Sequence, residues 1–386
     1  MSLRNRTMLI IGIVLMLLTL GAMMPLLGQG DTVITIALPP WVANAVTDDM
    51  MNGFEAQHPG VNVVIETSED MFFGSPGFDL EEHFTNVENY VQSADILYVQ
   101  GSPISPQATQ AGYILDLTPL VEGNPDFNVS DFYPAMLEAF QWDNGTWAVP
   151  IAGDVSMFVY DRIAFDEAGL SYPNANWTFA DLTNAAVALT QYDENGDPVI
   201  SGFPFFDLQT LYTVFYPNAP TYDTTQFPAM PDLNRPELVE FLEQYLAVEE
   251  QITPEEGGFD FENVTLEINS LWRLGNNNFS NSEREQDWQA ALLPGNRANL
   301  RVTGFAISAG TQYPELAFDL INFLSNDAAF VQRVFSNRPA RQSLVGVEAE
   351  SDFFIGNELP EEAEALIDEG LQNAFSASQA RYFDFV

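Results

Sequence analysis

The chain has 386 residues, of which 46% are hydrophobic and 13% aromatic, so it can bury large cores in two or three domains. Its 55 acidic residues outnumber 12 basic residues, all arginine, and leave a formal net charge of -43. The negative electrostatic field of this charge repels nucleic acids and anionic membranes. It also disfavours a polyanionic ligand unless the few arginines cluster at one site. We interpret most of the carboxylates as a solvated, repulsive surface and not as catalytic groups.

Several kinds of chemistry lack the residues that they need. The chain has no cysteine, which excludes disulfides, thiol nucleophiles and cysteine-ligated metals. Its two histidines, His58 and His83, fall in a Pro-Gly turn and among acidic residues of a predicted helix. A histidine-based metal site or catalytic triad is therefore disfavoured, and we expect neither a metal nor a cofactor.

Residues 1–30 predict a signal peptide or an N-terminal anchor. Arg4 and Arg6 precede an apolar run that begins at Met8, and small residues at Gly28 and Gly30 permit cleavage of the segment. Residues 8–27 are also long enough to remain as a membrane anchor. We favour cleavage, and either outcome predicts that the rest of the chain is exported.

The first part of the mature chain alternates strands and helices. Thr32 to Leu38 predicts a buried strand, Val42 to Gln57 a helix, and Val61 to Glu66 a second strand. A strand pair joined by a helix crosses over right-handedly, so this order predicts a parallel sheet. A helix over Asp79 to Ser93 and a strand over Asp95 to Val99 continue the pattern. The fold class is therefore α/β.

The central stretch, Phe140 to Thr190, begins with a turn at Asp143-Asn144-Gly145. A strand closed by Pro150 and a second strand from Ser156 follow. The next elements are a helix over Arg162 to Ala168, which Gly169 ends, and a helix that Thr178 caps.

The second half of the chain predicts further elements of both kinds. Asp193 to Asp197 has the composition of a calcium loop, but Pro198 and Pro204 stand where an EF-hand needs glycine and glutamate, so we expect a turn. The other expected elements are helices over Arg235 to Val248 and Tyr313 to Ser325 and strands over Val264 to Trp272, Asp287 to Pro294 and Val302 to Ser308.

Spaced motifs resemble the sugar-binding extracellular solute-binding proteins of ABC importers, the group that includes maltose-binding protein. The matching stretches are Tyr160-Asp161-Arg162, Ala168-Gly169-Leu170, Trp177-Thr178, Gly112 to Leu120 and Arg338-Pro339-Ala340-Arg341-Gln342-Ser343. Asp161 stands in place of the family's usual asparagine. The Ala-Ala-Met stretch that the family has before the tryptophan is missing before Trp272. The resemblance spans about Val33 to Ser343.

The resemblance implies a two-lobed, periplasmic-binding-protein-like fold, in which each lobe is a mostly parallel sheet flanked by helices and the ligand cleft lies between the lobes. The chain would cross between lobes near Pro150, near Pro294 to Asn299 and near Ser325. We accordingly expect an N-terminal lobe of residues 31–150 plus 297–325 and a C-terminal lobe of residues 151–296 plus 326–386.

Candidate ligand contacts follow from chemistry and position. Open α/β sheets bind ligands beyond the carboxyl ends of their strands, aromatic rings stack on the apolar faces of sugars, and Asp or Gln bonds to their hydroxyls. The predicted ligand-binding residues are Trp41, Phe73, Gln100, Ser102, Asp154, Tyr212 and Trp272. Trp142 and Trp147 are expected to pack around their turn, and Arg341 to pair with a carboxylate for structure.

The function that the resemblance implies is capture of a neutral carbohydrate by lobe closure and delivery to an ABC permease, by a monomer that breaks no bond. A secreted glycoside hydrolase is one alternative, because paired carboxylates and aromatics also describe such sites. A membrane-anchored ligand sensor is another. The resemblance leaves oligosaccharide, monosaccharide, polyol, glycerol phosphate ester and peptide open as ligands.

Overall fold

The computed structural model describes residues 32–44, 46–67, 80–100, 106–204, 208–223, 230–252, 263–275, 285–334, 338–347 and 359–376. The predicted signal peptide or anchor, residues 1–30, lies outside these ranges. Among the described residues, no helix combines the length and the apolar character needed to cross a membrane.

The elements alternate along the chain as the α/β prediction requires. The strands are β1 (Thr32–Leu38), β2 (Val61–Thr67), β3 (Ile96–Gln100), β4 (Gln141–Trp142), β5 (Gly145–Thr146), β6 (Val149–Asp161), β7 (Gln191–Tyr192), β8 (Pro198–Ile200), β9 (Tyr222–Asp223), β10 (Met230–Pro231), β11 (Leu266–Ser270), β12 (Trp288–Ala291), β13 (Asn299–Ile307) and β14 (Arg338–Pro339). The α-helices are α2 (Pro40–Ala43), α3 (Asp48–Gln57), α4 (Leu80–Ser93), α5 (Pro106–Gln110), α6 (Thr118–Gly123), α7 (Pro134–Glu138), α8 (Arg162–Ala168), α9 (Phe179–Leu189), α10 (Leu208–Phe215), α11 (Pro236–Ile252), α12 (Trp272–Gly275), α13 (Pro314–Ser325), α14 (Ala328–Val331) and α15 (Glu361–Gln372). Two 3₁₀ turns are η1 (Val129–Asp131) and η3 (Gln342–Leu344).

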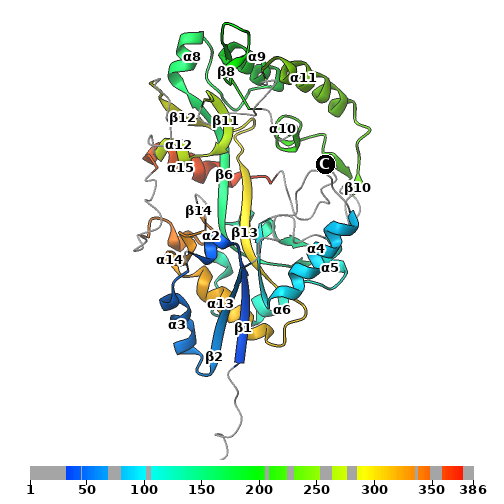
Figure 1. Cartoon of the computed structure of the whole chain (residues 1–386), viewed down its shortest axis with the longest axis vertical. Coiled ribbons are helices and arrows are strands. Elements are labelled where there is room, and N and C mark those ends of the chain that lie inside the picture. Colours follow the sequence, from blue (N-terminus) through cyan, green and yellow to red (C-terminus); the bar gives the residue numbers. More distant parts are fainter. Residues whose placement is uncertain are drawn as a thin grey trace, which may run out of the picture.

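One sheet runs through both lobes. Its strand order is β11-β6-β13-β3-β1-β2, and β12 and β14 also pair with β6. In Figure 1, β6 and β13 follow the long axis, from the lower lobe, which holds β1, β2 and α13, to the upper lobe, which holds α8, α9 and α11. We call the segment where these two strands lie side by side the crossing. The two-lobed α/β class is confirmed.

The expected parallel pairing holds only for part of this sheet. β1 pairs in parallel with β2 and with β3, because helices connect these strands. β6 is antiparallel to β11, β12, β13 and β14. The upper part of the sheet, around the end of β6, is therefore antiparallel, and a mostly parallel sheet in each lobe is wrong in this detail.

Two expected boundaries differ from the structure. Pro150 does not end a strand, because β6 is continuous over 13 residues. The register of β6 against β13 shifts opposite Thr303 and Gly304, so Ile151 is an extra residue in a bulge, where a strand tolerates a proline. The helix expected over Val42 to Gln57 is two helices, α2 and α3.

Local chemistry explains how other elements begin and end. Thr47 is extended at the start of α3, and Asp48 and Asp49 follow in the first turn, where carboxylates favour a helix N-terminus. The Thr178 side chain accepts from the Asp181 N–H and the Asp181 side chain accepts in return from Thr178, which confirms the expected cap of α9. Gly169 ends α8 in the left-handed region at φ 65°.

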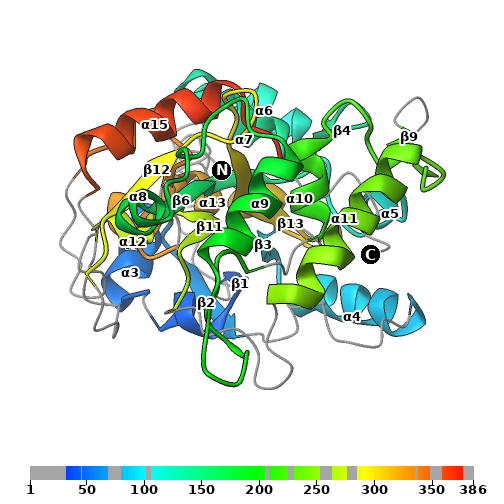
Figure 2. The same ribbon diagram turned by 90° about the horizontal axis from the view of Figure 1, so that it is seen from above.

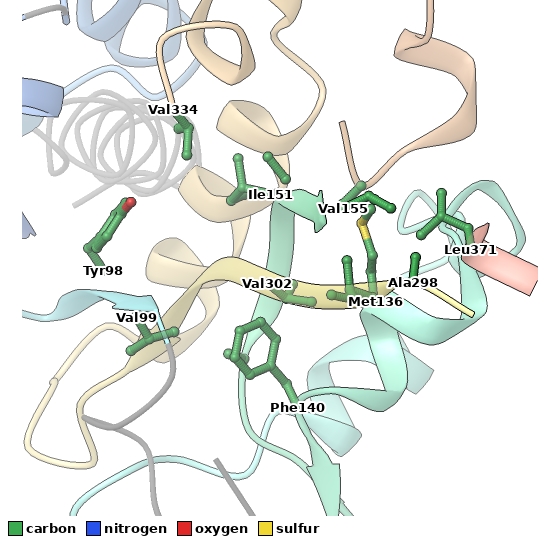
Figure 3. Close-up of a cluster of buried hydrophobic side chains, with 14 of the residues drawn as sticks. Tyr98, Val99, Met136, Phe140, Ile151, Val155, Ala298, Val302, Val334 and Leu371 are labelled. Carbon is green, nitrogen blue, oxygen red and sulfur yellow. The ribbon is translucent and has the colours of Figure 1, made fainter. Parts of the chain in front are cut away.

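The face of the crossing toward α7 and α15 is apolar. Figure 3 shows Met136 of α7, Val155 of β6, Ala298 and Leu371 of α15 gathered along β13. Gly370 permits this close approach, since a Cβ there would lie 2.8 Å from the Cβ of Ala298. Seen from above, α15 and α4 lie on opposite sides of the molecule (Figure 2).

Buried Arg338 fastens α15 to the edge of the sheet. Its Nη2 lies 2.9 Å from Glu364 Oε2 and 3.1 Å from Asp368 Oδ1. The Tyr133 hydroxyl, from the residue that precedes α7, donates to the same Asp368 carboxylate at 3.3 Å. The helix that covers the back of the crossing is thus held by charge-assisted hydrogen bonds.

Arg341 has the structural environment that the sequence predicts for it. Its side chain is 1% exposed and lies 4.2 Å from the Phe132 ring centroid. Nη2 donates to Asn322 Oδ1 of α13 at 2.9 Å, and Nη1 lies 3.5 Å from Asp131 Oδ2. Burial lowers the pKa of Arg341, and Asp131 opposes this shift. This guanidinium joins the C-terminal part of the chain to α13 and to η1.

Residues after α13 also contact the lower lobe. The Phe330 ring lies 5.9 Å from that of Phe305 in β13, and Arg333 Nη1 donates to the Ala329 carbonyl beside Met50 of α3. These contacts favour a last crossing later in the chain than Ser325. The exact limits of the two lobes stay a prediction.

We expect Gly304→Ala to destabilise the crossing by about 2 kcal/mol or more, because the added Cβ meets backbone that has no room to move. That Cβ would lie 2.5 Å from the Val149 carbonyl oxygen and 2.7 Å from Phe140 Cε2. Urea unfolding measures the loss. The matched control is Gly123→Ala, where nothing lies within 4 Å of the added carbon. Equal stability of the two variants would contradict the packing described here.

We expect Arg341→Met to cost about 3 kcal/mol in the free energy of unfolding, because it leaves the buried Ser325 hydroxyl and the half-buried Asn322 and Asp131 without their donor. Arg162→Met is the control. Arg162 pairs with Asp166 and Asp287 at the surface, where ion pairs contribute little, so its unfolding midpoint should hardly move. Similar midpoints for both variants would refute the structural role of Arg341.

Candidate ligand site

The face of the crossing opposite α15 is polar. Because directly opposed residues in antiparallel strands project to one face, the register places five polar side chains together there. Arg301 lies opposite Asp154, and Thr303 lies opposite Gln100 of β3. We call this set the polar band: Gln100, Asp154, Ser156, Arg301 and Thr303.

The side chains of the polar band differ in how deeply they are buried. Thr303 and Ser156 are buried at 1% and 8% exposure. Gln100 and Asp154 are half-buried, and Arg301 is exposed. Partly desolvated groups behind an exposed cation give a ligand both strong hydrogen bonds and access.

Aromatic clusters flank the polar band on the same sheet face. In the upper lobe, Phe158 of β6 lies 5.5 Å from Trp177 and 6.4 Å from Phe215 of α10, measured between ring centroids. In the lower lobe, Tyr98 of β3 lies 6.1 Å from Phe305 of β13. These clusters cover the sheet above and below, so the polar band occupies the interval between the lobes.

Hydrogen bonds and charge connect the more buried residues of the polar band to Tyr98. Gln100 Nε2 donates to Thr303 Oγ1 at 3.2 Å. Burial raises the pKa of Tyr98 to about 12, a hydrogen bond with Thr303 opposes the shift, and the charge of Asp154 adds to it. Tyr98 therefore stays protonated at neutral pH, and its hydroxyl lies within the electrostatic influence of Asp154.

The structure brings together two of the residues predicted from the sequence. Gln100 and Asp154 both belong to the polar band. Trp41 lies in α2, just after the carboxyl end of β1, where it is half-buried and packs against the core. The ligand-binding role of these three residues stays a prediction.

The other predicted residues are not gathered at the band. Tyr212 is 3% exposed in α10, where its hydroxyl donates to the Ala219 carbonyl at 2.7 Å and its ring stacks on Tyr216. Its surface is thus occupied by packing, which favours a core role. Phe73, Ser102 and the side chain of Trp272 lie outside the described residues, although the backbone of Trp272 begins α12.

Sequence reasoning missed Arg301, Ser156 and Thr303. The strand predicted from Val302 is β13, which begins at Asn299 and so includes Arg301. A charged residue inside a strand that is otherwise buried was the available signal. Its partners could not be read locally, since Gln100 and Thr303 are 203 positions apart.

Two expectations about packing and metals can be compared with the structure. Trp142 and Trp147 stack at 6.0 Å, and Trp147 Nε1 donates to the Trp142 carbonyl, which confirms that they pack around their turn. The turn expected over Asp193 to Asp197 is present, because Asp193 Oδ1 accepts from the N–H groups of Asn195 and Asp197. Within the described ranges, no group of three or more His, Asp or Glu side chains is placed to hold a metal ion.

Comparison with solved structures identifies the same architecture in sugar complexes. An ABC substrate-binding protein from Listeria monocytogenes in complex with cycloalternan superposes with a TM-score of 0.65 at 19% identity, covering 90% of this chain and 88% of that one. CpMnBP1 with mannobiose bound gives 0.66 at 17% identity, with 91% of each chain covered. The maltose/maltodextrin-binding domain MalE from Bdellovibrio bacteriovorus bound to maltotriose gives 0.59 at 16% identity, covering 90% and 89%. At these identities the likeness shows the fold.

The family is shown by the sequence. A search of curated proteins finds no match. The family model of the bacterial extracellular solute-binding proteins, in contrast, matches residues 36–329, which include all of the polar band and most of the chain. The chain therefore belongs to the bacterial extracellular solute-binding protein family.

Proposed function

We propose that this protein captures a carbohydrate between its two lobes and delivers it to the transmembrane subunits of an ABC importer. The observation that carries the proposal is the polar band, a row of hydrogen-bonding side chains that lies on the crossing between two aromatic clusters. Family membership supports export of the chain. Cleavage of residues 1–30, in preference to anchoring through residues 8–27, is part of the proposal.

The solved complexes support the ligand class. Proteins of this fold are known with cycloalternan, mannobiose and maltotriose bound, and one from Agrobacterium vitis with D-mannitol. All four ligands are neutral and rich in hydroxyl groups. A band of side chains that donate and accept hydrogen bonds suits such molecules.

We assign each group in the band a role in binding. Asp154 accepts from a sugar hydroxyl, which is a charge-assisted hydrogen bond of about 1.5–3 kcal/mol. Gln100 supplies a second donor and acceptor from β3. Trp41 and Trp272 provide rings for the apolar sugar faces, each at the end of a strand where open α/β sheets bind ligands.

Lobe closure converts binding into a signal for transport. Ligand that contacts both lobes stabilises the closed form alone, so the population shifts toward it by the difference in affinity. β6 and β13 are the strands that both lobes share in the described structure, and they are the elements about which we place the motion. A monomer is sufficient for this mechanism.

Catalysis is not part of the proposal. A retaining glycosidase needs two carboxylates about 5–5.5 Å apart, and an inverting one needs a pair farther apart. The polar band contributes one carboxylate, Asp154. Turnover of a chromogenic glycoside would support the hydrolase alternative, whereas saturable binding without product supports the carrier.

Thermal-shift screening against a panel of sugars and polyols tests the proposal. A ligand at about 100 times its dissociation constant should add about 2.7 kcal/mol to the free energy of unfolding. Small-angle scattering with the same ligand should show a smaller radius of gyration. Identical scattering with and without every ligand that binds would contradict closure.

We expect Trp272→Ala to weaken ligand binding at least about tenfold, which is about 1.4 kcal/mol, and to leave the fold intact, because a stacking ring is lost. Isothermal titration calorimetry measures the affinity. Tyr313→Ala is the control, since Tyr313 is an exposed aromatic residue at the start of α13, outside the polar band. Unchanged affinity in Trp272→Ala would remove this residue from the site.

A further inference from the structure

Arg301 differs from the other arginines that the structure describes. Seven others have partners in the protein. The surface pairs involve Arg162 and Arg235, and the more buried contacts involve Arg273, Arg297, Arg333, Arg338 and Arg341. Within the described part of the chain, the side chain of Arg301 is exposed, donates no hydrogen bond and forms no ion pair.

The charge of the chain makes an unpartnered arginine unexpected. Acidic residues outnumber basic ones 55 to 12, so a surface arginine has abundant carboxylates as potential partners. Five of the other described arginines pair with carboxylates, as Arg338 does with Glu364 and Asp368. A cation that none of the described residues pairs with points to a partner that arrives from outside.

The position of Arg301 places that partner in the polar band. Arg301 lies directly opposite Asp154 on β6. It is two residues before Thr303 and on the same sheet face. Gln100 donates to Thr303 from the next strand. A ligand that hydrogen-bonds to Gln100 and Asp154 is therefore within one side-chain length of the guanidinium.

Guanidinium chemistry selects among the possible ligands. A planar guanidinium binds a carboxylate through two parallel charge-assisted hydrogen bonds, whereas a sugar hydroxyl offers it one neutral acceptor. Asp154 disfavours a second anionic group on the opposite side of the band. The arrangement suits a ligand with a single carboxylate at one end and neutral hydroxyls at the other.

We propose that Arg301 is a specificity-determining residue and that the carbohydrate carries a carboxylate, as in an oligosaccharide that contains a uronic acid. This inference rests on the proposed function and replaces the neutral ligand expected from the sequence with one that carries a single carboxylate. Arg301 would bind the carboxylate, and Asp154 and Gln100 would bind hydroxyls of the same or the neighbouring sugar ring.

The net charge of -43 does not oppose this ligand decisively. At physiological ionic strength, exposed charges separated by more than about 8 Å are largely screened. A carboxylate in the band is close to Arg301, and acidic residues beyond that distance act on it only weakly. The net field lowers the rate of encounter with an anion more than it lowers the strength of contact once bound.

Matched disaccharide pairs test the inference. Galactobiose, cellobiose and mannobiose are each compared with the disaccharide in which one ring carries a carboxylate at C6, so that the members of each pair differ in a single carboxylate. Calorimetry with the whole protein should show that one uronate binds at least about tenfold more tightly than its neutral partner. Its affinity should fall as salt rises, and that of the neutral sugar should hardly change.

Variants of Arg301 assign the preference to this residue. Arg301→Gln should lose at least about tenfold in affinity for the uronate and little for the neutral sugar. Arg301→Lys keeps the positive charge but loses the planar pair of donors, so it should retain only part of the preference for the uronate. Arg162→Gln, an exposed arginine outside the band, is the control and should behave as the wild type. Because Arg301 is exposed, unfolding midpoints should be unchanged in all three variants.

The outcomes separate this inference from the function on which it rests. Tight binding of neutral sugars without any preference for a uronate overturns the role of Arg301 and leaves the carrier function standing. A uronate preference that survives Arg301→Gln also overturns it. Failure to bind any saccharide, neutral or acidic, overturns both.

Discussion

The antiparallel pairing of β6 with β13 is the interaction on which the rest of the structure depends. β6 is 13 residues long and is the one described strand that pairs with β11 and β12 at one end and with β13 and β14 at the other. A strand shared in this way must satisfy two environments on its two faces. The face toward α7 and α15 is buried and apolar, and the opposite face alternates between aromatic clusters and the polar band. Period-two alternation along a single strand thus creates a core and a candidate binding surface together.

The bulge at Ile151 interrupts the regular pairing of β6 with β13 near the start of β6. An extra residue increases local twist and frees one position from the regular ladder. Ala340 uses that position, since its N–H donates to the Ile151 carbonyl. Gly304 across the ladder accommodates the Val149 carbonyl, for which a side chain would leave no space. This irregular point in the ladder lies in the segment about which we propose that the lobes move.

Local signals were sufficient for much of the fold. Thr32 to Leu38 and Arg162 to Ala168 were predicted with the bounds that the structure has, because β-rich runs, caps and glycine stops act within a few residues. The prediction that a strand ends at Pro150 was wrong. A proline interrupts a strand unless a bulge accommodates it, and this bulge depends on β13, far along the chain. Gln100 and Asp154 were selected by the rule about strand ends. The rule fits Gln100, the last residue of β3, but Asp154 lies inside β6, so it was selected from a boundary that the structure does not have. Arg301 and Thr303 were missed because only the register identifies their face.

The distribution of arginine links stability to recognition. Buried arginines hold separate parts of this acidic chain together, with Arg341 between η1 and α13 and Arg338 between β14 and α15. Each is useful in the interior because a guanidinium satisfies several acceptors at once and remains charged. Arg301 has the same chemistry, but it is exposed on a strand that both lobes share, and none of the described carboxylates pairs with it. Its exposure and its place opposite Asp154 are the grounds on which we propose a carboxylate-bearing ligand, and in that proposal a ligand that contacts β6 and β13 links the elements that both lobes share.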